Sequence, residues 1–362
     1  MQEDQKEQRE QRAQKEQRAQ REQHDRSTQI AYIGADELTK LLPPREAVTA
    51  IREALIGGLD PAAAGPPRSI LELPEDQGQL LAMPSASEFG VGVKAISAVP
   101  ANADRGLPRI QGVHLVFRPP SYAPAAVVDG AALTTLRTPA VSVAAVLPLL
   151  TRPGRRWRVV VFGAGPQGAG HVRTLRDVGA ELAEVTYVVR DPSRADAALV
   201  GDDNVVATAD AEAWVRRADL VVCATPSPTP LFDSALLGDD AVVLAVGSHD
   251  ADAREVDSAL TARAQVIVED PDTALRECGD IVIPVAEGVL PAERLLPMAR
   301  VVRDESQYAT DRPVLFKGSG MAWQDAVVAD AAVRASDSRV SPAASDDRVS
   351  PAASDDRVGP AT

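Results

Sequence analysis

The chain has 362 residues and a formal net charge of −14 at pH 7. A chain of this length can form two domains, each with a hydrophobic core of its own. The acidic balance argues against nucleic acid as a partner, because binding to phosphates requires a basic surface. No run of 18 or more apolar residues occurs, and the beginning of the chain is charged and rich in glutamine, so neither a membrane span nor a secretory signal is expected.

The two cysteines, Cys223 and Cys278, lie too far apart in the sequence to form a metal-binding motif, and we predict no metal site. Cys223 belongs to an apolar run and is expected in the core rather than as a nucleophile. With no secretory signal expected, we place the protein in the cytoplasm.

Both ends of the chain are predicted to be disordered tails. Residues 1–27 are almost wholly charged residues and glutamine, with no apolar stripe that a coiled coil could bury. Residues 336–362 carry a nine-residue repeat of low complexity. The folded body is therefore expected at about residues 28–335.

The first part of this body predicts a helix followed by a curved antiparallel sheet. The helix is expected around residues 44–57, and prolines and glycines separate the short apolar runs that follow it. The strands are predicted at residues 69–73, 79–83, 91–99, 113–117 and 125–128. An apolar, alanine-rich helix comes next, at residues 131–150.

From Arg158 to about Pro284, apolar runs alternate with helical segments, which is typical of an α/β fold with a doubly wound parallel sheet, the Rossmann fold. The strands are predicted at residues 159–162, 185–189, 205–207, 220–224, 242–246 and 266–268. A last helix is predicted at residues 322–335, and we expect it to pack on the first part of the body.

The most informative motif is a glycine-rich turn between the first of these strands and a helical run. Gly163, Gly165 and Gly168 have the G-x-G-x-x-G spacing, with Val159–Phe162 before them and residues 171–178 after them. The first glycine permits a tight turn, the second lets the backbone approach a pyrophosphate, and the third lets helix and strand pack closely. The motif predicts a nicotinamide or flavin nucleotide at the helix N-terminus, and the alternative is a glycine-rich connector.

The loop after the next predicted strand bears on the choice of cofactor. An acidic residue there would bond the ribose 2′-hydroxyl of NAD, whereas an arginine suits the 2′-phosphate of NADP. Arg190 comes first and Arg194 is close by, so NADP(H) is favoured, while the neighbouring Asp191 keeps NAD(H) open. The alternative for Asp191 is a helix N-cap ahead of Pro192, and we favour that interpretation.

Two more loops follow strands at the edge where Rossmann sheets bind their ligands. Ala224, Thr225 and Pro226 have small or hydroxyl-bearing side chains, which would let the nicotinamide ribose pass. The loop Gly247–Asp250 is where nicotinamide and substrate are expected to meet. Its His249 could act as a general acid near neutral pH, although loop histidines are more often solvated and inactive.

Three cationic residues of the first part are candidates for binding a carboxylate. Lys94 lies within an otherwise apolar run, which is unusual unless its charge is paired or meets a ligand. Arg68 precedes a strand, and Arg137 lies in the apolar helix. If the three side chains converge, they would bind a carboxylate together. The alternative for each one taken singly is a charge on the surface.

Six blocks of the sequence match one family in the same order. They are residues 92–94, 105–112, 129–138, 163–168, 279–288 and 316–325. Together they resemble the ornithine cyclodeaminase/mu-crystallin family, over about residues 29–335.

The resemblance implies a homodimer whose chains have two domains each. A substrate-binding and dimerisation domain would comprise residues 28–140 and 312–335, and a Rossmann NAD(P)-binding domain residues 141–311. The resemblance also implies a small amino or imino acid as substrate. Arg68, Lys94 and Arg137 match the family's substrate- and carboxylate-binding residues by position.

The loops and the resemblance together give the expected cofactor-binding residues. They are Thr138, Gly163, Ala164, Gly165, Pro166, Gln167, Gly168, Arg190, Asp191, Arg194, Ala224, Thr225, Pro226, Val246, Gly247, Ser248, Lys317, Ser319 and Gly320.

One departure from the family concerns the acid/base. Cyclodeaminases of the family carry an aspartate in the loop after the fifth strand, and His249 takes its place here in an ungapped match. Asp250 could substitute only if the loop shifts by one residue. The catalytic candidates are therefore Lys94, His249 and Asp250, and the namesake reaction is disfavoured.

The function predicted first is an NAD(P)H-dependent reductase or dehydrogenase that acts on the C=N or CH–NH bond of a small imino or amino acid. Ketimine and pyrroline-2-carboxylate reductases of the family have this activity. The first alternative is a cyclodeaminase that releases ammonia from ornithine or lysine with bound NAD. The second is a non-enzymatic, mu-crystallin-like protein that binds NADP and a small ligand.

Overall fold

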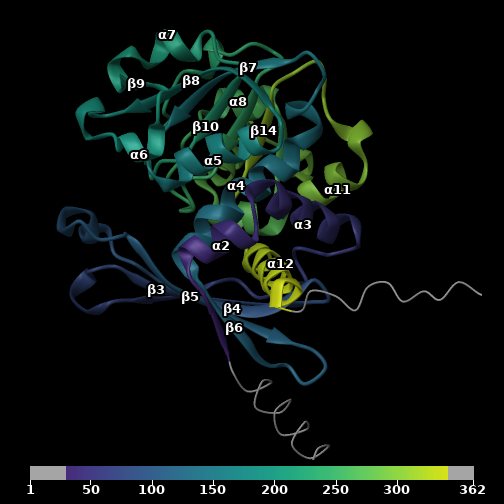
Figure 1. Cartoon of the computed structure of the whole chain (residues 1–362). Helices are drawn as coiled ribbons and strands as arrows, with labels where there is room; N and C mark the ends of the chain where they lie inside the picture. The colour runs from purple at the N-terminus through teal and green to yellow at the C-terminus, as the bar shows by residue number, and fades with distance from the viewer. Residues whose placement is uncertain (1–29, 341–362) are drawn as a thin grey trace, which may run out of the picture.

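The computed structural model describes residues 30–340, in which two sheets are joined by a layer of helices (Figure 1). The predicted N-terminal tail and most of the predicted C-terminal tail lie outside the described residues. Residues 336–340, however, continue the last helix, α12 (Ala322–Val340), so the predicted start of the tail at residue 336 is wrong. Ion pairing of Arg118 with Asp337 and a hydrogen bond from Arg339 to the Lys40 carbonyl hold this last turn on the body.

The first sheet has six strands in the order β1-β6-β5-β4-β3-β2. The strands are β1 (Ala31–Ile33), β2 (Ser69–Glu72), β3 (Gln79–Ser87), β4 (Gly90–Ala98), β5 (Ile110–Arg118) and β6 (Ala123–Asp129). Strands β2 to β6 pair antiparallel, as the sequence predicts. Strand β1 was not predicted, because three residues are too short for a pattern, and it pairs parallel to β6.

Only one face of this first sheet is covered within the described residues. Helices α2 (Ala35–Leu41), α3 (Pro44–Ile56) and α12 lie on one side of it, as predicted for α12, and the other side carries no helix (Figure 1). Because side chains alternate along a strand, Lys94 of β4 points to the helices, whereas its neighbours Val93 and Ala95 point away. Apolar side chains on the uncovered face include Tyr32, which is 63% exposed, and Val113, which is 40% exposed.

The second sheet has eight strands, all parallel, in the order β13-β12-β14-β11-β10-β7-β8-β9. The strands are β7 (Arg156–Phe162), β8 (Glu181–Val189), β9 (Asn204–Ala207), β10 (Leu220–Cys223), β11 (Val242–Ala245), β12 (Gln265–Val268), β13 (Leu296–Pro297) and β14 (Val314–Lys317). The predicted doubly wound parallel sheet is confirmed, with two strands more than predicted.

Strand β14 corrects the predicted domain boundary. Residues 312–335 were assigned to the first domain, yet β14 lies between β11 and β12 in the centre of the parallel sheet. This strand lies beyond Pro284, where the predicted alternation of strands and helices ends, and its partners are more than 40 positions away. Only the part from α12 onwards returns to the first sheet.

Helices cover both faces of the parallel sheet. They are α5 (Pro166–Asp177), α6 (Ala197–Val200), α7 (Ala211–Val215), α8 (Ser258–Arg263), α9 (Pro271–Glu277), α10 (Gly279–Ala286) and α11 (Met298–Arg303). Alternate residues of β7 belong to two separate core clusters. Val159 and Val161 pack in the cluster that contains α4 and α5, whereas Val160 and Phe162 pack in the cluster that contains α8. This alternation is what a strand buried on both faces requires.

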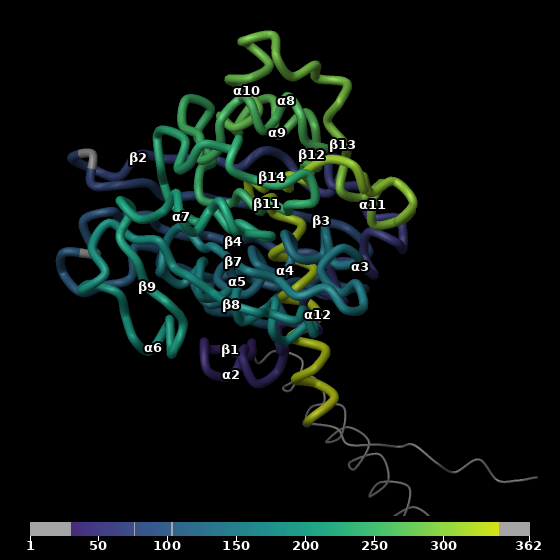
Figure 2. Tube along the Cα trace, turned by 90° about the horizontal axis from the view of Figure 1, so that it is seen from above, coloured from purple at the N-terminus to yellow at the C-terminus, as the bar shows by residue number. Residues whose placement is uncertain are grey.

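Helix α4 (Gly130–Leu150) lies between the two sheets (Figure 1) and beside α12 (Figure 2). The Asp129 side chain accepts a hydrogen bond of 2.8 Å from the Ala132 N–H and so caps the start of the helix. By length and composition α4 could cross a membrane, but 67% of its apolar window is buried inside the described structure. It is the shared core helix of the two domains, so the predicted boundary at residue 140 falls inside it.

Candidate functional site

The glycine turn has the geometry that a dinucleotide requires. Gly163 has a φ of +99°, and a Cβ there would lie 2.8 Å from the Ala224 carbonyl oxygen. A Cβ on Gly168 would lie 2.0 Å from the Gly163 carbonyl oxygen, so helix and turn touch at this point. A Cβ on Gly165 would meet nothing within 4 Å, because Gly165 faces open space at the start of α5. The backbone is therefore open to a ligand at the second glycine, and the residues fit a pyrophosphate.

The start of α5 supplies the positive end of a helix to this space. Pro166 occupies the first helical turn, and Gly165, the N-cap residue, has no side chain that could cap the helix. The first N–H groups of a helix have no carbonyl partner within it, and they attract anions. The side-chain amide of Gln167 donates to the Thr134 carbonyl oxygen at 3.2 Å and ties α5 to α4.

In the loop after β8, the side chain of the aspartate has hydrogen-bond partners, whereas those of the two arginines are exposed. Asp191 accepts hydrogen bonds from the backbone N–H of Ser193 at 3.0 Å and from its hydroxyl at 2.7 Å. These bonds lower the pKa of Asp191 and make it a cap, as the favoured interpretation predicts. Arg190 and Arg194 are exposed, and neither forms an ion pair within residues 30–340. Both guanidinium groups are therefore open to a phosphate.

A buried carboxylate that the sequence did not single out joins the ends of β10 and β11. Glu255 is fully buried, and one of its oxygens accepts from the Thr225 N–H at 2.8 Å and from the Thr225 hydroxyl at 3.0 Å. The other oxygen accepts from the N–H groups of Gly247 at 2.6 Å and Ser248 at 3.2 Å. A Cβ on Gly247 would lie 2.1 Å from the Thr225 nitrogen, so only glycine allows this approach.

Lys317 lies beneath these loops, and its predicted contact with the cofactor stays a prediction. Its ammonium is fully buried, 3.0 Å from a carboxylate oxygen of Asp280, and donates to the Ser248 carbonyl oxygen. The other oxygen of Asp280 accepts from the N–H of Glu255 at 2.7 Å. Burial opposes the charge of Lys317, but Asp280 and the acidic groups beside it raise the pKa of Lys317 above its usual range.

His249 and Asp250 lie in the exposed part of the loop after β11. Partial desolvation and then the positive charge of Arg68 lower the pKa of His249, and Asp250 opposes this shift. Arg68 of the first domain is thus near enough to this loop to affect its electrostatics. A place for His249 beside the substrate, and a catalytic role for it or for Asp250, stay predictions.

Two of the three predicted cations do converge, on a carboxylate of the chain itself. The Lys94 ammonium lies 2.7 Å from Oδ2 of Asp325, and both side chains are fully buried. Arg137 Nε lies 3.2 Å from Oδ1 of the same carboxylate, and Arg137 also donates to the Gln324 side chain at 2.7 Å. Sheet, central helix and last helix thus meet in one buried ion cluster, and direct contact of Lys94 and Arg137 with substrate stays a prediction.

The burial of this cluster shifts its protonation equilibria. Burial, with a smaller contribution from Arg137, lowers the pKa of Lys94 to about 8 although Asp325 opposes the shift. Burial also opposes the charge of Asp325, but Lys94 and Arg137 hold the pKa of Asp325 below its usual value. His114, opposite Lys94 on β5, has its pKa lowered to about 4 by burial and is neutral.

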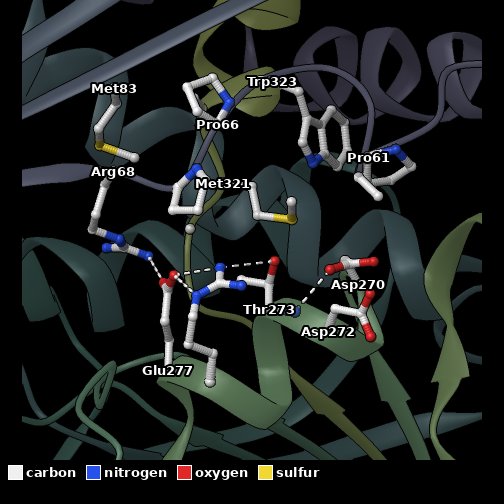
Figure 3. Close-up of a pocket in the computed structure, with 16 residues that line it drawn as sticks. Pro61, Pro66, Arg68, Met83, Asp270, Asp272, Thr273, Glu277, Met321 and Trp323 are labelled. Carbon is white, nitrogen blue, oxygen red and sulfur yellow. Dashed lines mark hydrogen bonds and ion pairs between the residues drawn. The ribbon is translucent and has the colours of Figure 1, made fainter.

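Arg68 is the cation that reaches open space, and it bridges the two domains. It donates to Glu277 of α9 at 2.9 Å and to the Ser319 carbonyl oxygen at 2.8 Å. Glu277 is also paired with Arg276 at 2.7 Å, so two guanidinium groups share one carboxylate. Figure 3 shows this row of charges along one side of a cavity.

The cavity lies between the first domain and α9 and has a volume of about 210 Å³. Pro66, Met83 and Trp323 form its apolar side, opposite the charged side chains (Figure 3). A volume of this size accommodates several water molecules or the side chain of a small amino acid. The cavity thus has one apolar side and one charged side, on which Arg68 and Arg276 lie beside the carboxylates of Asp270, Asp272 and Glu277.

The turn after β14 contributes Gly320 to the lining of this cavity. The carboxylate of Glu269 accepts hydrogen bonds from Ser319 and from the N–H of Gly320. Gly320 has a φ of +84°, and a Cβ there would lie 2.7 Å from the guanidinium of Arg137. Ser319 and Gly320, predicted to bind the cofactor, thus also shape the substrate side.

The sequence revealed the cations of the site but not its buried carboxylates. Asp325 and Glu277 pair with cations, and Glu269 and Glu255 accept from backbone N–H groups, in each case with a partner that lies far away along the chain. Their positions depend on how the domains pack, and no local pattern marks them. Glu269 directly follows a predicted strand, which is the one signal that could have found it.

Comparisons with known proteins agree with this geometry. The model of the ornithine cyclodeaminase/mu-crystallin family matches residues 36–338. A Delta(1)-pyrroline-2-carboxylate reductase of Paracoccus denitrificans is 33% identical over 253 residues, which are 68% of this chain and 79% of the relative.

Two solved structures have the same fold. The Delta(1)-pyrroline-2-carboxylate reductase of Thermococcus litoralis, in complex with NADH and L-proline, superposes with a TM-score of 0.77 at 24% identity, covering 86% of this chain and 98% of that one. An archaeal alanine dehydrogenase dimer with bound NAD superposes with a TM-score of 0.74 at 25% identity, covering 86% and 97%.

Proposed function

This chain belongs to the ornithine cyclodeaminase/mu-crystallin family, and from this membership and the geometry of the site we propose that it is an NAD(P)H-dependent reductase of small imino acids. In the reverse direction the same site would oxidise an amino acid. Both reactions concern one bond, the C=N or CH–NH bond beside a carboxylate. The similarity to pyrroline-2-carboxylate reductases supports this reaction class.

One observation carries the proposal: the glycine turn and the cavity with Arg68 open at the same edge of the parallel sheet. Gly163 follows β7, Gly247 follows β11 and Ser319 follows β14, and the carboxyl ends of parallel strands share an edge. A dinucleotide over β7 to β11 would therefore lie beside a carboxylate held at β14.

The chain's own part in the reaction is to bind and orient the substrate. The substrate carboxylate takes the place of Glu277 at Arg68, while Glu277 keeps its pair with Arg276, so no charge is left without a partner. Lys94, Asp325 and Arg137 stiffen the structure behind Arg68 and add positive potential. His249, or water beside it, supplies the proton to the nitrogen, and a bound nicotinamide would supply the hydride.

NADP(H) is favoured over NAD(H) as the cofactor. The support is the pair of exposed arginines, Arg190 and Arg194, after β8, together with the use of Asp191 as a cap. A 2′-phosphate would find two free guanidinium groups there, whereas a 2′-hydroxyl would find no free carboxylate.

The proposed enzyme works as a homodimer through the uncovered face of the first sheet. A row of exposed apolar side chains on a sheet without a covering layer is a common site of association. The archaeal alanine dehydrogenase of the same fold is a dimer. The two free cysteines, both buried, fit a reducing compartment such as the cytoplasm.

The test is a screen for oxidation of NADPH, which is monitored as the loss of absorbance of the reduced nicotinamide. The substrates are 2-oxo acids mixed with ammonia or methylamine, and preformed cyclic imines with a 2-carboxylate, and the screen is repeated with NADH. We expect oxidation that depends on the imine. Formation of a cyclic amino acid from ornithine or lysine without net use of NADPH would instead identify a cyclodeaminase. Binding of NADPH with no turnover of any kind would identify a binding protein.

A further inference from the structure

The carboxylate of Glu255 is held in its ionised form by its surroundings. Each of its two oxygens accepts two hydrogen bonds from N–H or O–H donors of Thr225, Gly247 and Ser248. The oxygen that accepts from Gly247 and Ser248 faces only N–H donors, so a proton there would find no acceptor. Burial and the neighbouring Asp280 raise the pKa of Glu255, while Lys317 and the charge-assisted hydrogen bonds oppose this shift and stabilise the ionised form.

The buried charges around Glu255 do not cancel. Two carboxylates, those of Glu255 and Asp280, share one ammonium, that of Lys317, and all three residues are buried. The thiols of Cys223 and Cys278 lie nearby but add no charge, because burial raises their pKa values. One elementary negative charge is thus left in excess in a region that solvent does not reach.

This excess charge lies directly under the loops that follow β10 and β11. The backbone N–H groups of Thr225 and Gly247 in these loops donate to Glu255. The two residues lie so close together that a Cβ on Gly247 would clash with the backbone of Thr225. In the proposed function these loops hold the nicotinamide half of the dinucleotide. Within a low-dielectric interior a fixed charge acts over such short distances with little screening.

We propose that Glu255 is a positioning residue whose negative charge stabilises the oxidised nicotinamide relative to the reduced one, an inference that rests on the proposed function. The oxidised ring carries a positive charge and the reduced ring is neutral, so a nearby carboxylate favours the oxidised state. Hydride donation builds up that positive charge, and a fixed charge arranged in advance lowers its barrier. Glu255 would thus bias the bound cofactor towards giving up its hydride.

The test compares the affinities of NADP+ and NADPH, measured by calorimetry without any substrate. In Glu255→Gln we expect the ratio of the dissociation constants, oxidised over reduced, to rise about tenfold, in line with the loss of one unit charge at close range. For a two-electron couple, a tenfold change corresponds to about 30 mV in the potential of the bound cofactor. A purely structural role would weaken both forms by the same factor.

Asp280→Asn distinguishes the effect of the negative charge from the effect of a changed loop conformation. Asp280 makes no hydrogen bond to Thr225 or Gly247, and an asparagine oxygen can still accept from the N–H groups of Glu255 and Val256. This variant removes the excess charge while leaving the Glu255 contacts, so the ratio should rise here too. It also keeps the proposal testable where Glu255→Gln fails to fold, as judged by its thermal transition.

Asp219→Asn is the matched control, because it removes a carboxylate just before β10, at the opposite end of this strand. The ratio should stay at its original value in this variant. An unchanged ratio in both Glu255→Gln and Asp280→Asn would overturn the inference. Failure of the unmodified protein to bind either form would instead overturn the proposed function, so the two failures can be told apart.

Discussion

At the scale of single residues, the site depends on charges that are paired before any substrate arrives. Lys94 has no exposed surface, and an isolated ammonium in that position would be too costly to bury. Asp325 offsets this cost by pairing with Lys94, and it also pairs with Arg137. The sequence pattern identified Lys94 as unusual, but it could not tell a ligand from an internal partner 231 positions away, because that distinction depends on where α12 packs.

The pKa of Lys94 predicts the pH dependence of the free enzyme. Since burial lowers this pKa to about 8, Lys94 is charged below that pH and neutral above it. We expect kcat/KM, which reports on the free enzyme, to fall as the pH rises through about 8. In Lys94→Arg the guanidinium stays charged, so this alkaline limb should move to higher pH. An identical limb in both proteins would assign it to another group.

The arginines after β8 predict the preference for the phosphorylated cofactor. Arg190→Ser combined with Arg194→Ser should weaken NADPH binding by about a hundredfold or more, because two charge-assisted bonds of about 1.5–3 kcal/mol each are lost. The affinity for NADH should not change. Arg216→Ser, which removes an exposed arginine paired with Glu212 elsewhere, serves as control in the same fluorescence titration. Equal weakening of both cofactors would remove the basis for the NADP assignment.

At the scale of elements, long and regular patterns were predictable and short strands were not. The strands of the parallel sheet with four or more consecutive apolar residues and the helices α3, α4 and α12 were predicted, with ends that differ by a few residues. Strands β1 and β13 were missed, since two or three residues carry no periodicity. Strand β14 is as long as β12, but it lies beyond Pro284, where the predicted alternation of strands and helices ends, and its place in the sheet is decided by distant partners. The glycine turn was predictable because its conformational demands are local.

Two glycines of this turn should respond differently to alanine. Gly168→Ala places a Cβ 2.0 Å from a backbone oxygen, so the free protein should lose about 1–3 kcal/mol of stability. Gly165→Ala meets no protein atom within 4 Å and has an extended backbone, so its melting temperature should stay the same. Its affinity for NADPH should nevertheless fall, because the new methyl group occupies the space of the pyrophosphate. Unimpaired NADPH binding by Gly165→Ala would contradict the proposed location of the cofactor.

At the scale of the whole molecule, the proposed cofactor site and the proposed substrate site lie on different domains. The glycine turn belongs to the parallel sheet, Arg68 to the first domain, and Glu277 links the two (Figures 1 and 3). The domain composition was predictable in outline from the change in pattern and from the family resemblance. The exact boundaries between the two domains were not predictable, because the chain adds β14 to the parallel sheet before it continues into α12 on the first sheet.

The uncovered face of the first sheet predicts the state of association. Val113→Lys places a charge among exposed apolar side chains and should convert a dimer into a monomer, as measured by light scattering after size exclusion. Ile56→Lys is the control, since Ile56 is 57% exposed but lies at the end of α3, away from this face. A dimer that survives Val113→Lys would place the interface elsewhere.

The most direct test of the central claim follows the hydride itself. NADPH deuterated at C4 of the nicotinamide is incubated with the protein and a 2-carboxylated cyclic imine, and the amino acid formed is examined by mass spectrometry and NMR. We predict one deuterium on the α-carbon of the product when the label is on one face of the ring, and none when it is on the other. A product without deuterium from either labelled form, or one formed without loss of NADPH, would contradict an imine reductase.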